Sequence, residues 1–279
     1  MKHIGYLVTV GSLSLALVAC GGGAASDSSA TGSNVATSAA SVASSAADPT
    51  SAEASLVGTW KAAAVQAGPV FITGDVEAYL GGFGLAGDQA MTMLLVLNED
   101  GSCELTYKGV PGQGTYTKTD TGIHVTVTNE AGKTADKDLL LHDGVLTIEA
   151  GEVKVSFSKD GTYPGAIDYD LTTAKPVSSA DQLVGDWELT GVRLQGVNMS
   201  GDPAELAKQI QRDNATAAFK ADGSCTLFGI ALTYTVGADG VTIGDGSVSY
   251  KIATLGDNLV IDLSDALGVE LAAIMSRSA

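Results

Sequence analysis

An internal repeat constrains the fold of this 279-residue chain more than any other feature. Leu56-Val57-Gly58-Thr59-Trp60 returns as Leu183-Val184-Gly185-Asp186-Trp187, and Asp100-Gly101-Ser102-Cys103 returns as Asp222-Gly223-Ser224-Cys225. The chain has two tryptophans, one in each copy at matching positions. A copy of about 100 residues is long enough to bury a core of its own. The repeat therefore predicts two tandem units of the same fold.

Apolar and polar residues alternate with a period of two through both copies. Ile123, Val125 and Val127 share one face of a predicted strand, while residues 124, 126 and 128 share the other. Asp143-Gly144 is one of several hairpin turn signals between such runs. Short strands joined by hairpins indicate an antiparallel meander that closes, or nearly closes, to hide its edges. We expect an all-β fold with two tandem small antiparallel barrels.

One short helix interrupts the strands of each unit. Asp202-Pro203-Ala204-Glu205 combines a capping residue, a proline at the first helical position and an early acid. This pattern predicts a helix from Pro203 to about Asn214. Its counterpart begins at Asp75 and is expected to be shorter, because Gly81-Gly82 interrupts it.

Residues 21–55 are almost entirely Gly, Ala, Ser and Thr. Such a composition offers too little apolar surface to offset the entropy of ordering, so we expect a disordered tether. The formal net charge of the whole chain is −17. An acidic, dispersed surface argues against nucleic-acid binding.

The N-terminus has the features of an export signal. Lys2 precedes an apolar stretch from Ile4 to Ala19, which is interrupted by small polar residues and is too short to span about 30 Å of hydrocarbon. The end of this stretch, Leu17-Val18-Ala19-Cys20, resembles the lipobox of bacterial lipoproteins. The resemblance implies cleavage before Cys20 and a diacylglycerol thioether on it. The membrane would then be a partner, with the protein lipid-anchored on the extracytoplasmic face of the cell membrane. The alternative is an ordinary signal peptide with an incidental cysteine.

Gly58-Thr59-Trp60 and Gly185-Asp186-Trp187 resemble the Gly-x-Trp motif that opens lipocalin-like β-barrels. In that family the tryptophan plugs one end of the barrel and a basic residue from the last strand packs across it. The resemblance implies that Lys159 covers Trp60 and that Arg277 covers Trp187, as a structural plug. The expected organisation is a signal peptide (1–19), the lipidated cysteine with the disordered tether (20–55), barrel 1 (56–171), a linker (172–182) and barrel 2 (183–279).

Cys103 and Cys225 occupy equivalent inward positions in the two copies. Equivalent interior positions of separate barrels lie too far apart for a bridge, so we expect buried free thiols. A disulfide between the units is the alternative. His124 and His142 have no neighbour at metal-ligand spacing, and no zinc site is expected.

The sequence contains no nucleophile elbow, no phosphate-binding glycine loop before a helix with a lysine, and no reason to pair two carboxylates. We therefore expect neither an enzyme nor a cofactor site. The segment from Gly81 to Leu97 has two interpretations. It is either a lid over a barrel mouth or, in Met91 to Leu97, a buried strand, and the buried strand is favoured.

Two hypotheses for function remain. In the first, the barrels of an exported envelope lipoprotein bind a small apolar or amphipathic ligand. In the second, the protein is a non-catalytic structural or protein-interaction module of the cell envelope. An enclosed apolar volume would favour the first hypothesis. Barrels filled by Tyr116, Phe157, Phe228 and Tyr234 would favour the second.

Overall fold

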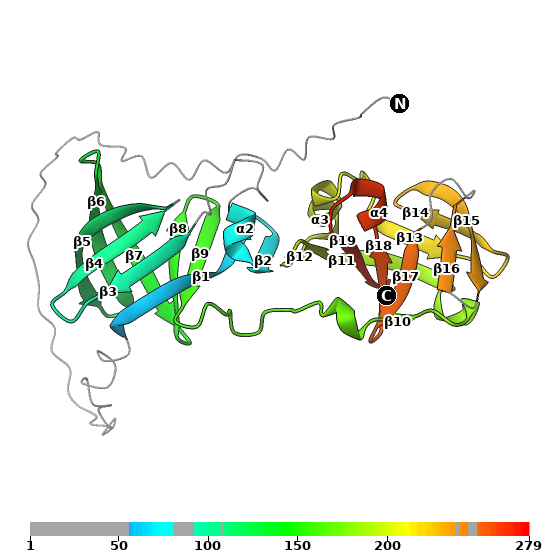
Figure 1. Cartoon of the computed structure of the whole chain (residues 1–279), viewed down its shortest axis with the longest axis horizontal. Coiled ribbons are helices and arrows are strands. Elements are labelled where there is room, and N and C mark those ends of the chain that lie inside the picture. Colours follow the sequence, from blue (N-terminus) through cyan, green and yellow to red (C-terminus); the bar gives the residue numbers. More distant parts are fainter. Residues whose placement is uncertain (1–55, 81–91, 108, 238–239, 245–249, 279) are drawn as a thin grey trace, which may run out of the picture.

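The computed structural model describes residues 56–80, 92–107, 109–237, 240–244 and 250–278. The predicted signal peptide, Cys20 and the tether lie outside these residues. The strands form two groups that follow one another along the longest axis of the molecule (Figure 1).

The first group of strands closes into an antiparallel barrel of eight. Its members are β1 (Gly58–Ala67), β3 (Met93–Leu97), β4 (Ser102–Tyr107), β5 (Val110–Thr119), β6 (Gly122–Asn129), β7 (Thr134–His142), β8 (Val145–Ala150) and β9 (Val153–Ser158). Each strand pairs with the next in this order, and β9 pairs back with β1. The prediction of a mainly β protein with a closed antiparallel barrel is confirmed.

The second group repeats this order of strands but leaves one junction unpaired. Its members are β11 (Gly185–Leu194), β13 (Thr216–Phe219), β14 (Ser224–Leu227), β15 (Ile230–Gly237), β16 (Gly240–Ile243), β17 (Lys251–Leu255), β18 (Asn258–Asp262) and β19 (Leu271–Arg277). Ladders run from β11 through β13, β14 and β15 to β16, and from β17 through β18 and β19 back to β11. No ladder joins β16 to β17 within the described residues, so this circuit is open there.

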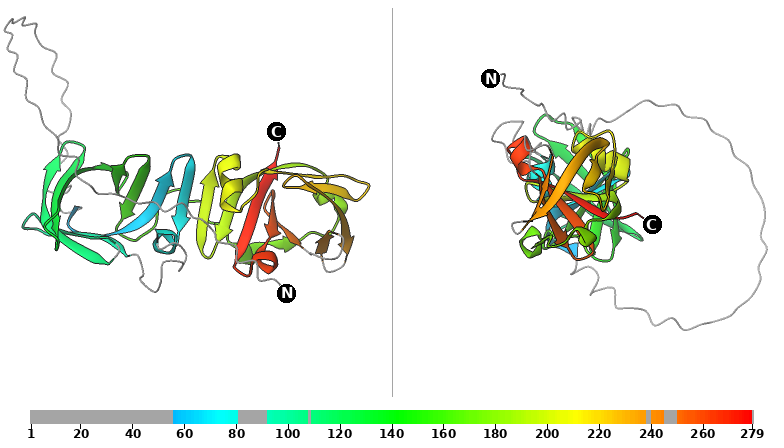
Figure 2. Two further views of the ribbon diagram at one scale, coloured as in Figure 1. Left: turned by 90° about the horizontal axis from the view of Figure 1, so that it is seen from above. Right: turned by 90° about the vertical axis from the view of Figure 1, so that its right-hand side faces the viewer.

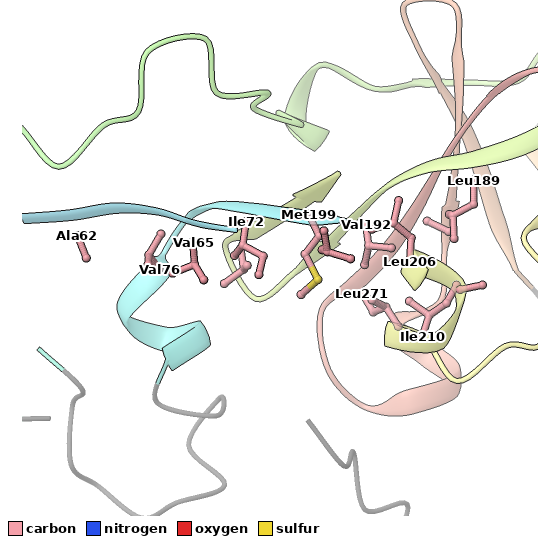
Figure 3. Close-up of a cluster of buried hydrophobic side chains, with 14 of the residues drawn as sticks. Ala62, Val65, Ile72, Val76, Leu189, Val192, Met199, Leu206, Ile210 and Leu271 are labelled. Carbon is pink, nitrogen blue, oxygen red and sulfur yellow. The ribbon is translucent and has the colours of Figure 1, made fainter. Parts of the chain in front are cut away.

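Two further strands join the groups into one sheet. β2 (Val70–Gly74) pairs with β1, β12 (Val197–Gly201) pairs with β11, and β2 and β12 pair with each other. They lie side by side in the middle of the molecule (Figure 2). The buried apolar side chains continue through this junction, where Ile72 and Met199 lie between the two groups (Figure 3). A single hydrophobic core therefore extends through both repeats.

The two-residue alternation sorts side chains as the sequence predicts. Ile123, Val125 and Val127 are buried, whereas His124 and Thr126 between them are half-exposed. In β3, Met93, Leu95 and Leu97 are buried in the same way, which agrees with the buried-strand interpretation of this segment. Residues 81–91, the other part of the proposed lid, lie outside the described residues.

The helices differ from the prediction in two respects. α2 (Val76–Leu80) and α3 (Pro203–Gln209) are the expected pair, and the Asp202 carboxylate caps α3 by accepting from the backbone N–H of Ala204 at 3.0 Å. The expected end of α3 near Asn214 is wrong. Gln211 has a positive φ, and the Asn214 side chain instead accepts from the backbone N–H of Thr216 at the start of β13.

A further short helix, α4 (Ser264–Leu267), makes the prediction of one helix per unit wrong for the second repeat. It turns the chain between β18 and β19. It ends at Gly268, whose φ of 72° lies in the left-handed region that favours glycine. Short 3₁₀ turns, η1 (Leu171–Thr173) and η2 (Ala180–Gln182), lie in the segment that connects the repeats, as does the two-residue strand β10 (Lys175–Pro176), which pairs with β17.

Candidate functional sites

Trp60 lies at the start of β1 and is almost fully buried. Its indole N–H donates to the carbonyl oxygen of Leu56 at 2.8 Å, so the one polar atom of the ring is satisfied. The Nζ atom of Lys159 lies 5.4 Å from the centroid of the ring, within the range of a cation–π contact, and donates to the carbonyl oxygen of Val57 at 3.0 Å. The structure thus brings together the first predicted pair.

The second repeat builds the same arrangement around Trp187. The indole N–H donates to the carbonyl oxygen of Leu183 at 2.7 Å, and the guanidinium carbon of Arg277 lies 4.4 Å from the ring centroid. Arg277 also donates to the carbonyl oxygens of Val184 at 2.9 Å and Gln182 at 3.3 Å. The arginine therefore lies nearer its indole than Lys159 does and makes one more backbone hydrogen bond.

Neither tryptophan site offers reactive chemistry. In each, a buried indole is covered by a cation that is itself held by backbone carbonyl groups. A hollow of about 550 Å³ adjoins Trp60 and Lys159, but its other lining residues come mainly from the turns after β7 and β9. Asp160 lines this hollow. The pKa of the Asp160 carboxyl group lies below its usual range because the Thr162 backbone N–H and neighbouring hydroxyl groups donate to the carboxylate.

The interiors of both repeats hold large side chains. Phe157, Phe228 and Tyr234 are buried, and Tyr116 is partly buried against the core. Phe219 packs edge-on against Tyr234 with ring centroids 5.4 Å apart. Barrels of eight strands are just wide enough for side chains to fill or for one small ligand. These aromatic side chains take up interior space and leave less room for a ligand among the core residues.

A pocket of about 530 Å³ lies at the unpaired junction between β16 and β17. Its apolar surface comes from Val241, Ile252, Val260 and Ala272, on four different strands. The segment that connects the repeats lies along one side, where Leu171, Ala174 and Pro176 line the pocket. β10 holds this segment in place by pairing with β17, and the Thr254 hydroxyl donates to the carbonyl oxygen of Lys175 at 3.3 Å.

Charged groups surround this apolar surface. Lys251 lines the pocket and lies 3.3 Å from Asp265, while Glu270 lines it and lies 3.3 Å from Arg193. The carboxylate of Asp262 lines it too and accepts from the backbone N–H of Ser264 at 2.9 Å. The pocket thus combines an apolar floor with a rim of one lysine and two carboxylates, as small-molecule sites commonly do.

The sequence did not predict this pocket, because it depends on the return of the connecting segment over the outer face of β17–β19. One signal was present. Leu271-Ala272-Ala273-Ile274-Met275 is continuously apolar, and all five residues are buried. Such a run is typical of a strand covered on both faces. On the outer face, Tyr169 of the connecting segment packs against Val260, Ala272 and Ile274, and Leu171 packs against the same cluster.

The remaining candidate residues carry no assembled site. Cys103 and Cys225 are free and buried, as expected, and burial raises the pKa of both thiols. His124 lies on the outer face of β6, 2.7 Å from an Asp138 oxygen, and His142 lies at a turn beside Asp143. Across the residues that the structure describes, no group of three or more His, Cys, Asp or Glu side chains could hold a metal ion.

The Asp-Gly-Ser turns of the repeat are hairpin turns. In each copy the aspartate carboxylate accepts from the serine backbone N–H and hydroxyl two residues later, at Asp100–Ser102 and at Asp222–Ser224. The serine hydroxyl, followed by its backbone N–H, lowers the pKa of each carboxyl group. These carboxylates therefore stabilise the turns in which they lie.

A comparison with protein-family models, curated proteins and solved structures finds no match. Within the described part of the chain, no helix is both long enough and apolar enough to cross a membrane.

Proposed function

We propose that the chain is an exported envelope lipoprotein, anchored through Cys20, whose two tandem lipocalin-like barrels form a binding module for a small apolar or amphipathic ligand. The lipobox-like Leu17-Val18-Ala19-Cys20 supports the anchor. The shared plug geometry of Trp60 with Lys159 and of Trp187 with Arg277 supports the tandem barrels, with the second one left open between β16 and β17.

The pocket beside β17 is the observation that carries the binding function. Its volume of about 530 Å³ lies within the range of small-molecule sites, about 300–1,000 Å³. Its floor is apolar and its rim holds Asp262 and Glu270 against Lys251. A ligand that fits has an apolar body and a neutral or cationic polar end, because the carboxylates outnumber the amine at the rim.

A direct test fills the pocket. Ala253 is half-buried and lines it, so Ala253→Trp places an indole in the space. Ala231 is exposed on β15 of the same repeat, so Ala231→Trp is a matched control. With the apolar dye N-phenyl-1-naphthylamine as probe, Ala253→Trp should weaken binding about tenfold or more, and Ala231→Trp should leave it unchanged. Native mass spectrometry of the purified protein would show whether a small molecule co-purifies. Equal dye binding by the two variants would contradict a site in this pocket.

The anchor has a separate test. Cys20→Ala should abolish metabolic labelling with a fatty acid and move the protein from the membrane fraction. Labelling that persists in this variant would contradict the anchor without touching the ligand site.

A second candidate function, a non-catalytic structural or protein-interaction module, is favoured by one observation. The β2–β12 ladder joins the two repeats into one elongated body (Figure 1), which suits a spacer or a display surface at the envelope. Unchanged dye binding in Ala253→Trp, together with no co-purifying molecule, would favour this candidate over ligand capture.

A further inference from the structure

We infer that the junction between β2 and β12 is a self-complementary interface, so that the edge strand of each repeat has as its natural partner another copy of the same unit. In an interface of this kind the same patch meets itself across a two-fold axis, and every contact occurs twice. Here the two copies of the patch belong to one chain. Three features of this one ladder obey the rule.

The first set is the strand register. The repeat aligns Ile72 with Met199, and these two residues are partners at the centre of the ladder. On one side of the centre Val70 pairs with Gly201, and on the other Gly74 pairs with Val197. Since the repeat aligns Val70 with Val197 and Gly74 with Gly201, the two pairs are images of each other. A shift of the register by one residue would place the buried Ile72 opposite Ser200, so the buried faces of the two strands would no longer match.

The second set is the pair of hydrogen bonds that closes the ladder at its two ends. The backbone N–H of Asp75 donates to the carbonyl oxygen of Gly196 at 3.1 Å, and the backbone N–H of Asp202 donates to the carbonyl oxygen of Pro69 at 3.3 Å. The repeat aligns Asp75 with Asp202 and Pro69 with Gly196. The two ends of the junction are therefore the same structure.

The third set is a pair of close backbone approaches. A Cβ atom at Gly74 would overlap the carbonyl oxygen of Gly196, and one at Gly201 would overlap the carbonyl oxygen of Pro69. Both glycines also have positive φ, at 83° and 135°. Glycine is thus required at the same place on both sides, because only it lets the other backbone come this close.

The chemistry of the patch explains why it needs a partner. Val70, Ile72, Val197 and Met199 are all at most 5% exposed and belong to the same core cluster. Ile72 and Met199 lie close together across the junction (Figure 3). Without its partner, either strand would present a bare sheet edge with apolar side chains, which favours pairing with another strand. The partner of matching shape and register is a second copy of the unit.

The connecting segment does not create this symmetry. Before Gly165, Tyr163 packs edge-on against Phe71 of its own repeat, with centroids 5.0 Å apart. After Gly165, Asp168 accepts from the side chain of Asn198 in the second repeat at 3.3 Å. A cut between Gly165 and Ala166, which are exposed, would therefore leave each of these contacts within its own fragment.

The experiment is to insert a protease site between Gly165 and Ala166 of the full chain and to cut it after purification. Native mass spectrometry and size-exclusion chromatography at micromolar concentration then report the assembly. We expect complexes of two fragments. Each complex contains either one copy of each fragment or two copies of the same fragment, and either result supports a self-complementary edge. Single fragments, folded or unfolded, would overturn the inference. Emission from Trp60 and Trp187, one in each fragment, reports the folded state of each unit.

Paired substitutions test the symmetry itself. In the cut protein, Gly74→Ala and Gly201→Ala should each raise the dissociation constant of the fragments about tenfold or more, and by similar factors. Gly144→Ala is the control, because Gly144 has a φ of 77° and nothing within 4 Å of an added Cβ atom. The Gly144→Ala variant has similar backbone strain but no overlap with a carbonyl oxygen, so it should leave the association of the fragments unchanged. Weakening by only one of the junction variants, or equally by Gly144→Ala, would contradict the two-fold interface.

Discussion

The two repeats share their plug, their turns and their junction strand, yet only the first closes within the described residues. In the first repeat β6 and β7 pair over seven residues, from Gly122 with Leu140 to Thr128 with Thr134. In the second, the corresponding strands β16 and β17 have four and five residues, and no ladder joins them within the part of the chain that the structure describes. Both copies form the long-range pairing of the last strand with the first, β9 with β1 and β19 with β11. The two repeats therefore differ at a local junction between consecutive strands. The open junction is where the pocket lies.

The largest expected effect comes from removing each plug in turn. Trp60→Ala and Trp187→Ala each delete a buried indole together with its hydrogen bond, which should cost about 3–5 kcal/mol of stability. Because the chain has two tryptophans, each variant keeps one fluorescent reporter in the unaltered repeat. Thermal unfolding followed by circular dichroism and by this fluorescence measures both repeats.

The shared core predicts that a substitution in one repeat lowers the stability of both repeats. Since buried side chains continue through the β2–β12 junction, the intact repeat should unfold together with the altered one. An unshifted fluorescence transition in the intact repeat would show that the two repeats unfold independently.

The basic residues over the indoles allow a finer comparison. Arg277 lies 4.4 Å from its ring and donates to two carbonyl oxygens, whereas Lys159 lies 5.4 Å from its ring and donates to one. Arg277→Met should therefore cost about 1–2 kcal/mol and Lys159→Met about 0.5–1 kcal/mol. Urea unfolding of both variants measures the difference. A larger loss at Lys159 would mean that the cation contacts do not determine the stability of the plugs.

Much of this architecture could be predicted from residue patterns. The alternation of Ile123, Val125 and Val127 predicts a strand with one buried face, and the resemblance of Gly58-Thr59-Trp60 to the lipocalin-like motif predicts that Lys159 covers Trp60. Such features depend on residues that are near in sequence or on a single pair of residues that a motif connects. The sequence pattern predicts an end of α3 about five residues beyond the observed one, because the side chain of Asn214 belongs to the turn before β13. Propensity alone does not distinguish these two uses of an asparagine.

The pocket and the junction could not be predicted in the same way. The pocket needs Leu171 and Pro176 to return over β17, and the junction needs β2 to meet β12 of the other repeat. Both depend on contacts between segments far apart in the chain. The alternation of apolar residues predicts which face of a strand is buried, but it does not predict which segment packs against that face. Gly74 and Gly201 occupy equivalent positions in the repeat, yet the reason for glycine there, a close backbone approach, is visible only in three dimensions.

The two buried thiols predict a dependence of stability on pH. Burial raises the pKa of Cys103 and Cys225 in the folded state above the unfolded value, so the unfolded state loses these protons first as pH rises. Each thiol should therefore lower stability above pH about 8.5, by at most about 1.4 kcal/mol per pH unit. Cys103→Ala and Cys225→Ala should each flatten the decline between pH 8.5 and 9.5 in urea unfolding. A slope that neither variant changes would assign the decline to other groups.

The smallest expected difference lies in the tyrosines that clamp the equivalent turns. The Tyr116 hydroxyl donates to the carbonyl oxygen of Asn98 at 2.9 Å, and the Tyr234 hydroxyl donates to that of Lys220 at 2.7 Å. Tyr234 is buried and Tyr116 is only partly so, so the acceptor in the second repeat has less access to replacement water. Tyr234→Phe should cost about 1 kcal/mol and Tyr116→Phe about 0.5 kcal/mol. Chemical unfolding in a background that keeps both tryptophans resolves this difference. Equal losses would mean that the open circuit of the second repeat admits water to its turn as readily as the closed barrel does.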